Sequence, residues 1–128
     1  RDVGEDRGRG RIYLPLEDLD KFNYSEEELM RGKINENWKA LMSFQLSRAR
    51  DWFIKSEEGI KWLSIDARWP IWTSLRLYSG ILNSIEKLDY DVFNNRAYVK
   101  GWVKALELPL SYLITINDEK YKLKTLFN

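Results

Sequence analysis

The sequence predicts an all-α protein, on two observations. Apolar side chains recur every three or four residues over residues 37–63 and again over residues 69–85, which is the repeat of a helix with one buried face. The chain also has no pair of alternating apolar and polar segments joined by a short turn, so no β-hairpin is expected.

Short elements are expected before the first long helix. Residues 1–11 are mostly charged residues and glycine, and Pro15 ends a brief apolar piece. From Pro15 to Met30 we expect a short helix or turn, a loop, and then one helical turn. Ser25 and Glu28 have the spacing of a capping box, which predicts the start of that turn, and Gly32 is expected to end it.

The first long helix is expected from about Asn37 to Leu63. Gln45 and Ser56 are the polar positions on its otherwise apolar stripe. The apolar members of that stripe are Trp38, Leu41, Met42, Ala49, Trp52, Phe53, Ile60 and Leu63.

The second long helix is expected to begin at Trp69-Pro70, because proline suits the first helical position. Its stripe places Tyr78 on the core side, between Leu75 and Leu82. A last helix is expected over about 97–108, where Pro109 interrupts it, and a Lys-rich tail over 117–128 is expected to fray.

Composition limits the chemistry that the chain can perform. Its 128 residues include no Cys and no His, which excludes disulfides, a thiolate nucleophile and an imidazole base or zinc ligand. Catalysis would therefore use carboxylates, Tyr, Arg and a hard metal ion. The net charge of +1 gives no reason to expect a nucleic-acid partner, and no stretch approaches the apolar length of a membrane span. The densely charged start without Met is interpreted as that of a chain cut from a longer one.

The charged opening is a candidate metal and diphosphate site. Asp2 and Asp6 are four residues apart, so on a helix both carboxylates project from one face. Mg²⁺ typically takes one or two carboxylates plus substrate phosphates, and arginines at 1, 7, 9 and 11 could bind phosphate oxygens. Two other interpretations stay open: an acidic pair on a solvated helix, neutralised by its arginines, and an RNA-binding Arg-Gly tract over 7–11.

The whole opening string resembles a known motif. Asp2-Val3-Gly4-Glu5-Asp6 and the following Arg11-Ile12-Tyr13-Leu14-Pro15 resemble the second aspartate-rich motif of squalene and phytoene synthases, DxxxD followed by RxYLP. Further segments up to about residue 113 are similar to that family, and closest to its phytoene synthase branch: Trp38–Arg50, Ala67–Pro70, Leu75–Tyr78 and Asp89–Val99.

This resemblance implies a fold and a set of roles. Residues 1–116 would be the C-terminal helices of the class I isoprenoid (terpenoid) synthase fold, with the N-terminal half absent. The parent would condense two geranylgeranyl diphosphates head to head to phytoene, through prephytoene diphosphate. Asp2 and Asp6 would bind Mg²⁺, or Mn²⁺ in its place. Arg1, Arg11 and Arg96 would contact the diphosphate. Tyr13 would help it to leave, and Tyr78 would lie near the reacting isoprenoid.

Alternatives within the family also follow. The parent could be a squalene or dehydrosqualene synthase that uses farnesyl diphosphate, with NADPH needed only for squalene, or an inactive scaffold relative. Since the family has two aspartate-rich motifs and only the second is found here, we expect this chain alone to be inactive. We expect a cytoplasmic or peripheral membrane location, or a plastid in a plant or alga. Apolar helix faces left uncovered would make the chain marginally stable or self-associating.

Overall fold

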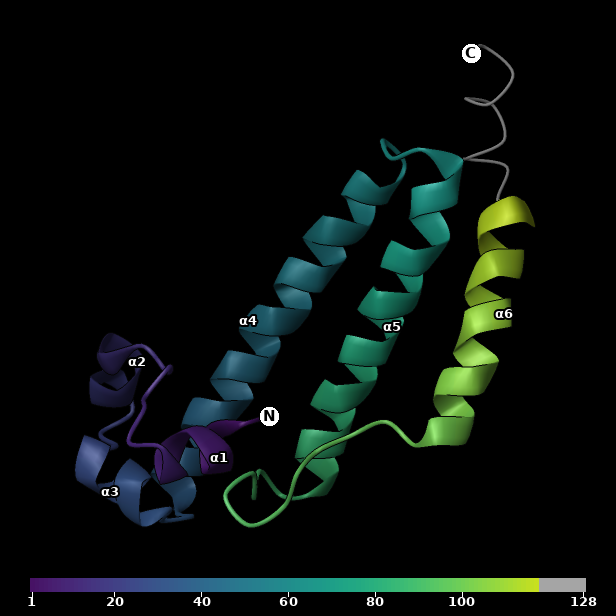
Figure 1. Ribbon diagram of the computed structural model, residues 1–128. Coiled ribbons are helices and arrows are strands. Elements are labelled where there is room, and N and C mark those ends of the chain that lie inside the picture. Colours follow the sequence, from purple (N-terminus) through teal and green to yellow (C-terminus); the bar gives the residue numbers. More distant parts are fainter. Residues whose placement is uncertain (118–128) are drawn as a thin grey trace. The chain divides into compact units, whose positions relative to one another are not determined.

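The computed structural model describes residues 1–117, and that part of the chain contains six helices and no strand (Figure 1). The prediction of an all-α protein is confirmed. The predicted tail over 117–128 lies outside the described residues, except for Asn117. The helices are α1 (Val3–Gly8), α2 (Leu16–Lys21), α3 (Glu26–Arg31), α4 (Glu36–Ile60), α5 (Ile65–Lys87) and α6 (Gly101–Asn117).

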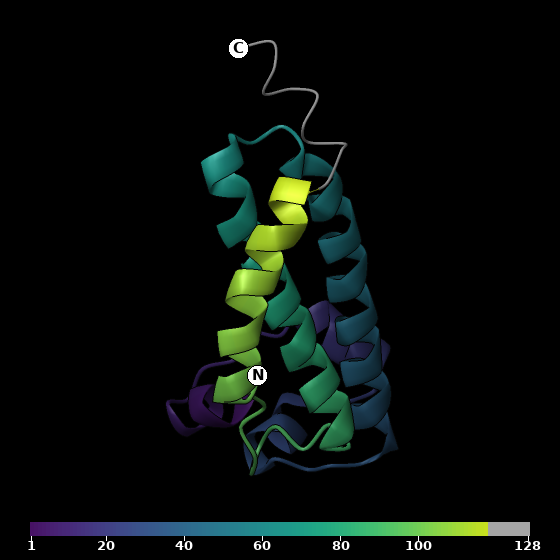
Figure 2. The ribbon, with the colours of Figure 1, turned by 90° about the vertical axis from the view of Figure 1, so that its right-hand side faces the viewer.

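The helices belong to two units of the chain. The first unit holds Arg1–Ala49 and Ile81–Tyr98, and the second holds Arg50–Gly80 and the chain from Val99 onward. The long helices α4 and α5 each contribute residues to both units, as their continuous ribbons show (Figures 1 and 2). Among the helices within residues 1–117, none is both long enough and apolar enough to cross a bilayer.

The predicted cap of α3 is present in the first unit. The backbone N–H of Glu28 donates to the Ser25 hydroxyl at 3.1 Å, and the Ser25 N–H donates to the Glu28 carboxylate at 3.1 Å. Gly32 ends the helix in the left-handed conformation, with φ of 67°. The capping box and the stop at Gly32 are therefore confirmed.

Trp38 is the centre of the core of the first unit. Its ring is fully buried and packs against Tyr24 and Phe93, with ring centroids 5.2 and 4.5 Å away. Its indole N–H donates to the carbonyl of Tyr90 at 3.0 Å, so the polar edge is satisfied inside the core. The predicted stripe members Leu41 and Met42 are buried beside it.

Polar Gln45, on the apolar stripe of α4, is explained by a buried carboxylate on α2. The Gln45 amide donates to Asp18 at 2.7 Å, and the Arg48 guanidinium donates to the same oxygen at 2.5 Å. Asp18 is buried, and the hydrogen bond from Arg48 lowers the pKa of its carboxyl below the usual range, with Gln45 contributing in the same direction. This cluster ties α2 to α4.

In the second unit, α5 begins at Ile65, so the prediction of a start at Trp69-Pro70 is wrong. Ser64 accepts backbone N–H bonds from Ala67 and Arg68 at 3.0 and 3.2 Å, which opens the helix a turn earlier. The buried Arg68 side chain then donates to the carbonyl of Leu63 at 2.8 Å. Pro70 lies inside the helix, beyond its first turn, so its missing N–H removes one intrahelical hydrogen bond.

The last helix also differs from the prediction, because α6 begins at Gly101 and continues through Pro109 to Asn117. Arg76 of α5 forms a two-point ion pair with Glu107 of α6, at 2.5 and 3.1 Å. Tyr112 packs edge-on against Trp69, with ring centroids 6.2 Å apart. These contacts on both sides of Pro109 hold the helix together where proline alone would favour a break.

The apolar stripes predicted for α4 and α5 are only partly buried. Tyr78 is 57% exposed and Trp52 is 62% exposed, so the prediction that Tyr78 faces a core is wrong for the described part of the chain. Ser56, the second polar position of the stripe, donates to the carbonyl of Trp52 at 2.8 Å. The exposed side chains fit the expectation of uncovered helix faces.

We predict that Gly4→Ala destabilises the first unit, because a Cβ there would lie 2.6 Å from the carbonyl oxygen of Phe93 and 2.9 Å from that of Val92. Both atoms are backbone, so they cannot swing aside, and we expect a loss of about 1–3 kcal/mol in unfolding free energy. Urea denaturation followed by circular dichroism measures it. Gly8→Ala in the same helix is the matched control, since nothing lies within 4 Å of its new Cβ. Equal stability of the two variants would refute the close packing.

We predict that Asp18→Asn lowers the unfolding free energy at pH 7 by about 1 kcal/mol, because it weakens the charge-assisted hydrogen bonds from Arg48 and Gln45. The pKa of Asp18 is lowered by folding, so this stability is present above the unfolded-state pKa of about 4 and is lost as the pH falls through the folded-state value. The gap between wild type and variant should therefore close in acid. The prediction is wrong if the difference in unfolding free energy between wild type and Asp18→Asn is unchanged in acid, or if Asp20→Asn at an exposed position lowers the unfolding free energy by the same amount.

Candidate functional site

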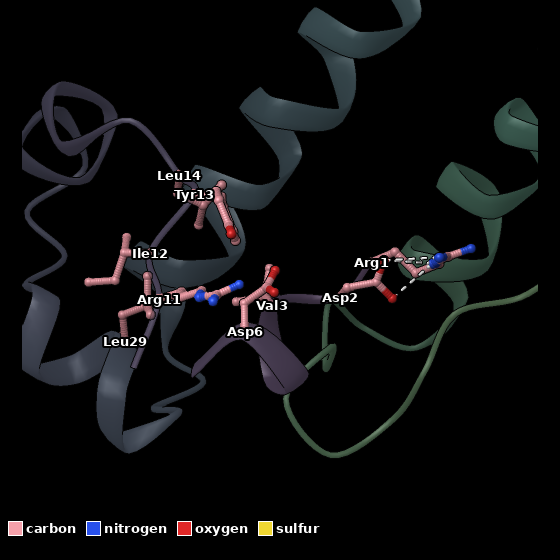
Figure 3. A pocket seen from close by; sticks show the side chains of 9 residues that line it. All are labelled: Arg1, Asp2, Val3, Asp6, Arg11, Ile12, Tyr13, Leu14 and Leu29. Carbon is pink, nitrogen blue, oxygen red and sulfur yellow. Dashed lines mark hydrogen bonds and ion pairs between the residues drawn. The ribbon is translucent and has the colours of Figure 1, made fainter. Parts of the chain in front are cut away.

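A pocket of about 290 Å³ lies beside α1 in the first unit (Figure 3). Residues of α1 and its N-terminal flank form one wall, the segment after α1 forms the other, and buried Leu29 of α3 contributes apolar surface. The lining residues are Arg1, Asp2, Val3, Asp6, Arg11, Ile12, Tyr13, Leu14 and Leu29.

The local fold brings the two predicted metal ligands to this pocket. Asp2 is the N-cap residue of α1 but makes no capping hydrogen bond with its side chain, and Asp6 lies within the helix. Both residues line the same pocket, but the Asp2 side chain points toward Arg1 and away from Asp6 (Figure 3). The side chain of Asp2 is therefore not used to stabilise the helix and is available for other partners.

Asp2 lies between two arginines. The Arg1 guanidinium donates to both carboxylate oxygens at 2.9–3.1 Å, and the Arg96 guanidinium lies 3.4 Å from Oδ1. The hydrogen bonds from Arg1 lower the pKa of Asp2 below its usual range, and the charge of Arg96 acts in the same direction. Asp2 is thus held in the ionised form that a metal ion requires.

Asp6, Arg11 and Tyr13 extend their polar ends toward a common space in the pocket, while Asp2 points toward Arg1 (Figure 3). Within residues 1–117, no side chain forms a hydrogen bond or ion pair with the Asp6 carboxylate. Arg11 is placed by a sharp turn: Gly10 has φ of 67°, and the Arg11 N–H donates to the Asp6 carbonyl at 2.9 Å. The Tyr13 side chain is 70% exposed.

A second hollow of about 160 Å³ in the first unit shares Arg1 and Asp2 with the first pocket. It brings Arg96, ninety-four positions after Asp2 in the sequence, to the same carboxylate. Its other lining residues are Gly4, Glu5, Val92, Phe93, Asn94 and Asn95. Asp2 is therefore common to both hollows.

The remaining two arginines of the charged opening have structural partners. Arg9 pairs with Glu5 at 2.7 Å, and the Arg7 guanidinium lies over the Phe93 ring, 5.1 Å from its centroid. The Arg-Gly tract over 7–11 is thus part of a helix and a turn that pack on the core, which disfavours its interpretation as an RNA-binding tail.

Tyr78 is the one predicted site residue outside the first unit. It lies on α5 in the second unit, while the other six (Arg1, Asp2, Asp6, Arg11, Tyr13 and Arg96) lie in the first. The sequence analysis missed Gly4, whose lack of a side chain allows α1 to approach Val92 and Phe93. A glycine inside a short charged helix was the available signal.

The donor set fits a magnesium ion that shares its ligands with a phosphate. No group of three or more His, Cys, Asp or Glu side chains positioned to hold a metal occurs within residues 1–117. Two carboxylates with nearby arginines instead suit Mg²⁺, which takes one or two protein carboxylates and completes its octahedron with water and phosphate oxygens. The residues present therefore fit the metal together with an anionic substrate.

Comparison with known proteins identifies the family of this chain. The family model described as Squalene/phytoene synthase matches residues 1–103. The chain is 58% identical over 113 residues to a 15-cis-phytoene synthase of Synechococcus elongatus, covering 88% of this chain and 37% of the relative. It is 57% identical to the 15-cis-phytoene synthase of Synechocystis and 48% identical to a chloroplastic phytoene synthase of Daucus carota, again with 88% of this chain but 34% and 28% of those relatives. It thus spans about a third of their length.

We predict that Asp2→Asn and Asp6→Asn each weaken Mn²⁺ binding in the presence of inorganic diphosphate by about tenfold or more, since each removes a carboxylate from the pocket. Electron paramagnetic resonance of free Mn²⁺ measures this directly. Glu27→Gln removes the same charge from an exposed position of α3 that lines neither hollow, and its carboxylate pairs with Arg31, so binding should stay within about twofold. A Glu27 variant that is as weak as the aspartate variants would point to net charge and exclude a defined site.

Proposed function

Because the chain belongs to the squalene/phytoene synthase family, we propose that it supplies the metal- and diphosphate-binding part of a prenyltransferase that makes phytoene. The full reaction would join two geranylgeranyl diphosphates head to head through prephytoene diphosphate. The observation that carries the proposal is the pocket that gathers Asp2, Asp6, Arg11 and Tyr13. The names of the cyanobacterial and plant relatives support phytoene as the product.

The pocket residues suit the first step, the ionisation of one substrate. The allylic C–O bond breaks and its electron pair leaves with the diphosphate. Mg²⁺, when bound by Asp2 and Asp6, would neutralise the charge of that leaving group. Arg11 and Arg96 would bind phosphate oxygens with their planar guanidinium groups, and Arg1 would exchange Asp2 for a phosphate oxygen.

The two tyrosines are proposed to act at different stages. The exposed Tyr13 hydroxyl in the pocket can donate a hydrogen bond to the departing diphosphate. Tyr78 is proposed to present its ring face to the allylic cation that remains, where an aromatic contact is worth about 0.5–2 kcal/mol. Its exposure on α5 leaves the ring available for such a contact.

The product determines the cofactor. Phytoene formation needs no reductant, so we propose Mg²⁺, replaceable by Mn²⁺, as the cofactor, and NADPH only if the product is squalene. Farnesyl diphosphate is the alternative substrate for a squalene or dehydrosqualene product. The intact Asp2 and Asp6 argue against an inactive scaffold. The plant relatives are named chloroplastic, which supports a plastid if this chain comes from a plant or alga.

A chimaera tests this proposal. The matching 113 residues of the Synechococcus elongatus relative are replaced by residues of this chain, which are 58% identical, and phytoene is measured in cells that make geranylgeranyl diphosphate. We expect phytoene to accumulate. Asp2→Ala or Asp6→Ala in the chimaera should lower it by at least about a hundredfold, because a metal ligand is lost.

The outcomes separate the alternatives. If product forms only from farnesyl diphosphate, the function is that of a squalene or dehydrosqualene synthase and the phytoene proposal is wrong. A folded chimaera without product from either substrate, beside an active relative, would favour the inactive scaffold. Glu27→Gln is again the matched control and should retain most of the product.

A further inference from the structure

We propose that Asp91 is a positioning residue that holds Arg96 for diphosphate binding. The inference rests on the proposed function, because it takes Arg96 as a ligand of the diphosphate. Asp91 lies in the segment between α5 and α6, five residues before Arg96, and lines neither hollow of the site. Any effect of Asp91 on the ligand would therefore act through another residue.

The Asp91 carboxylate organises the turn that leads to Arg96. Its Oδ1 accepts the backbone N–H of Asn94 at 3.0 Å, and its two oxygens accept the Asn94 side-chain amide at 3.1 and 3.3 Å. Its Oδ2 also accepts the Asn95 side-chain amide at 2.8 Å. A single carboxylate thus accepts hydrogen bonds from the two residues that immediately precede Arg96, one of them from the backbone N–H three residues on.

The start of this turn is anchored in the core of the first unit. The carbonyls of Val92 and Phe93 lie against Gly4 of α1 so closely that no Cβ would fit there. Phe93 packs on the buried Trp38 ring, and Ala97, directly after Arg96, is fully buried. The backbone of Arg96 is therefore held from both sides, and through Gly4 it is held to the same helix that carries Asp6.

Arg96 itself has little else to fix it. Its side chain is 65% exposed, and within residues 1–117 it forms a 3.4 Å ion pair with Asp2. A long exposed arginine loses much rotamer entropy when it binds a ligand, so a fixed backbone lowers the cost of ordering it. Asp91 supplies that fixed backbone where the chain leaves the core.

Calorimetric titration of this chain with inorganic diphosphate in Mg²⁺ tests the inference. We expect Asp91→Ala to weaken binding by about three- to tenfold, because the turn loses its acceptor. Asp91→Asn should weaken binding by about twofold, since its amide oxygen can still accept the Asn94 N–H but its amide nitrogen cannot accept from Asn95. Asp51→Asn removes an exposed charge from α4 and is the control for net charge.

A double-mutant cycle distinguishes positioning through Arg96 from a general structural effect. In an Arg96→Gln background, Asp91→Ala should cause no further loss of affinity, because the residue it positions is gone. The ¹⁵N heteronuclear NOE of the Arg96 amide should fall in Asp91→Ala and not in Asp51→Asn. Unchanged affinity or an unchanged NOE in Asp91→Ala, or equal losses in both backgrounds, would overturn the inference alone.

Two further outcomes complete the test. Failure of the wild-type chain to bind Mg²⁺-diphosphate would overturn the proposed function and this inference with it. If Asp91→Ala loses helix content by circular dichroism, Asp91→Asn, which removes the acceptor of the 2.8 Å bond and lines neither hollow, replaces it. That variant should weaken binding about twofold in the wild-type background and not at all with Arg96→Gln, and any other result would count against the inference.

Discussion

The buried indole of Trp38 is the contact on which the first unit depends. The ring of Trp38 packs against the rings of Tyr24 and Phe93, and its N–H donates to the carbonyl of Tyr90. It thus joins the loop after α2, the beginning of α4 and the segment that follows α5. Trp38 therefore helps to position the site, because the segment after α5 carries Arg96 and also provides the backbone against which α1 packs.

The site that results has one carboxylate at its centre. Asp2 contacts Arg1 and Arg96 and borders both hollows, whereas Asp6 faces one hollow without a described partner. Arg1 and Arg96 neutralise Asp2. Under the proposed function these arginines would exchange Asp2 for phosphate oxygens while the metal ion takes their place at Asp2, so that each charge keeps a partner.

Local patterns in the sequence predicted part of this arrangement. The capping box at Ser25, the stop at Gly32 and the core side of α4 near Trp38 follow from spacing alone. Spacing also places Asp2 and Asp6 at one pocket, but the direction of the Asp2 side chain is set by Arg1. The start of α5 and the length of α6 could not be predicted from local spacing. They depend on the Arg68 and Arg76 side chains, whose partners lie on other turns or another helix. The approach of Arg96 to Asp2 likewise depends on tertiary packing, and only the resemblance to a family suggested it.

The pattern of α6 has a practical consequence for work on the purified chain. Its inner side holds Glu107, Ser111 and Thr115, while Trp102, Leu106 and Leu113 point outward. Any association between copies through α6 would use the outward side, whereas contacts within the unit use the inner side. Replacing the outward apolar side chains with polar ones would raise solubility and leave the Arg76–Glu107 pair intact. A design that assumed the apolar side of α6 to be the buried one would instead alter the side that packs within the unit.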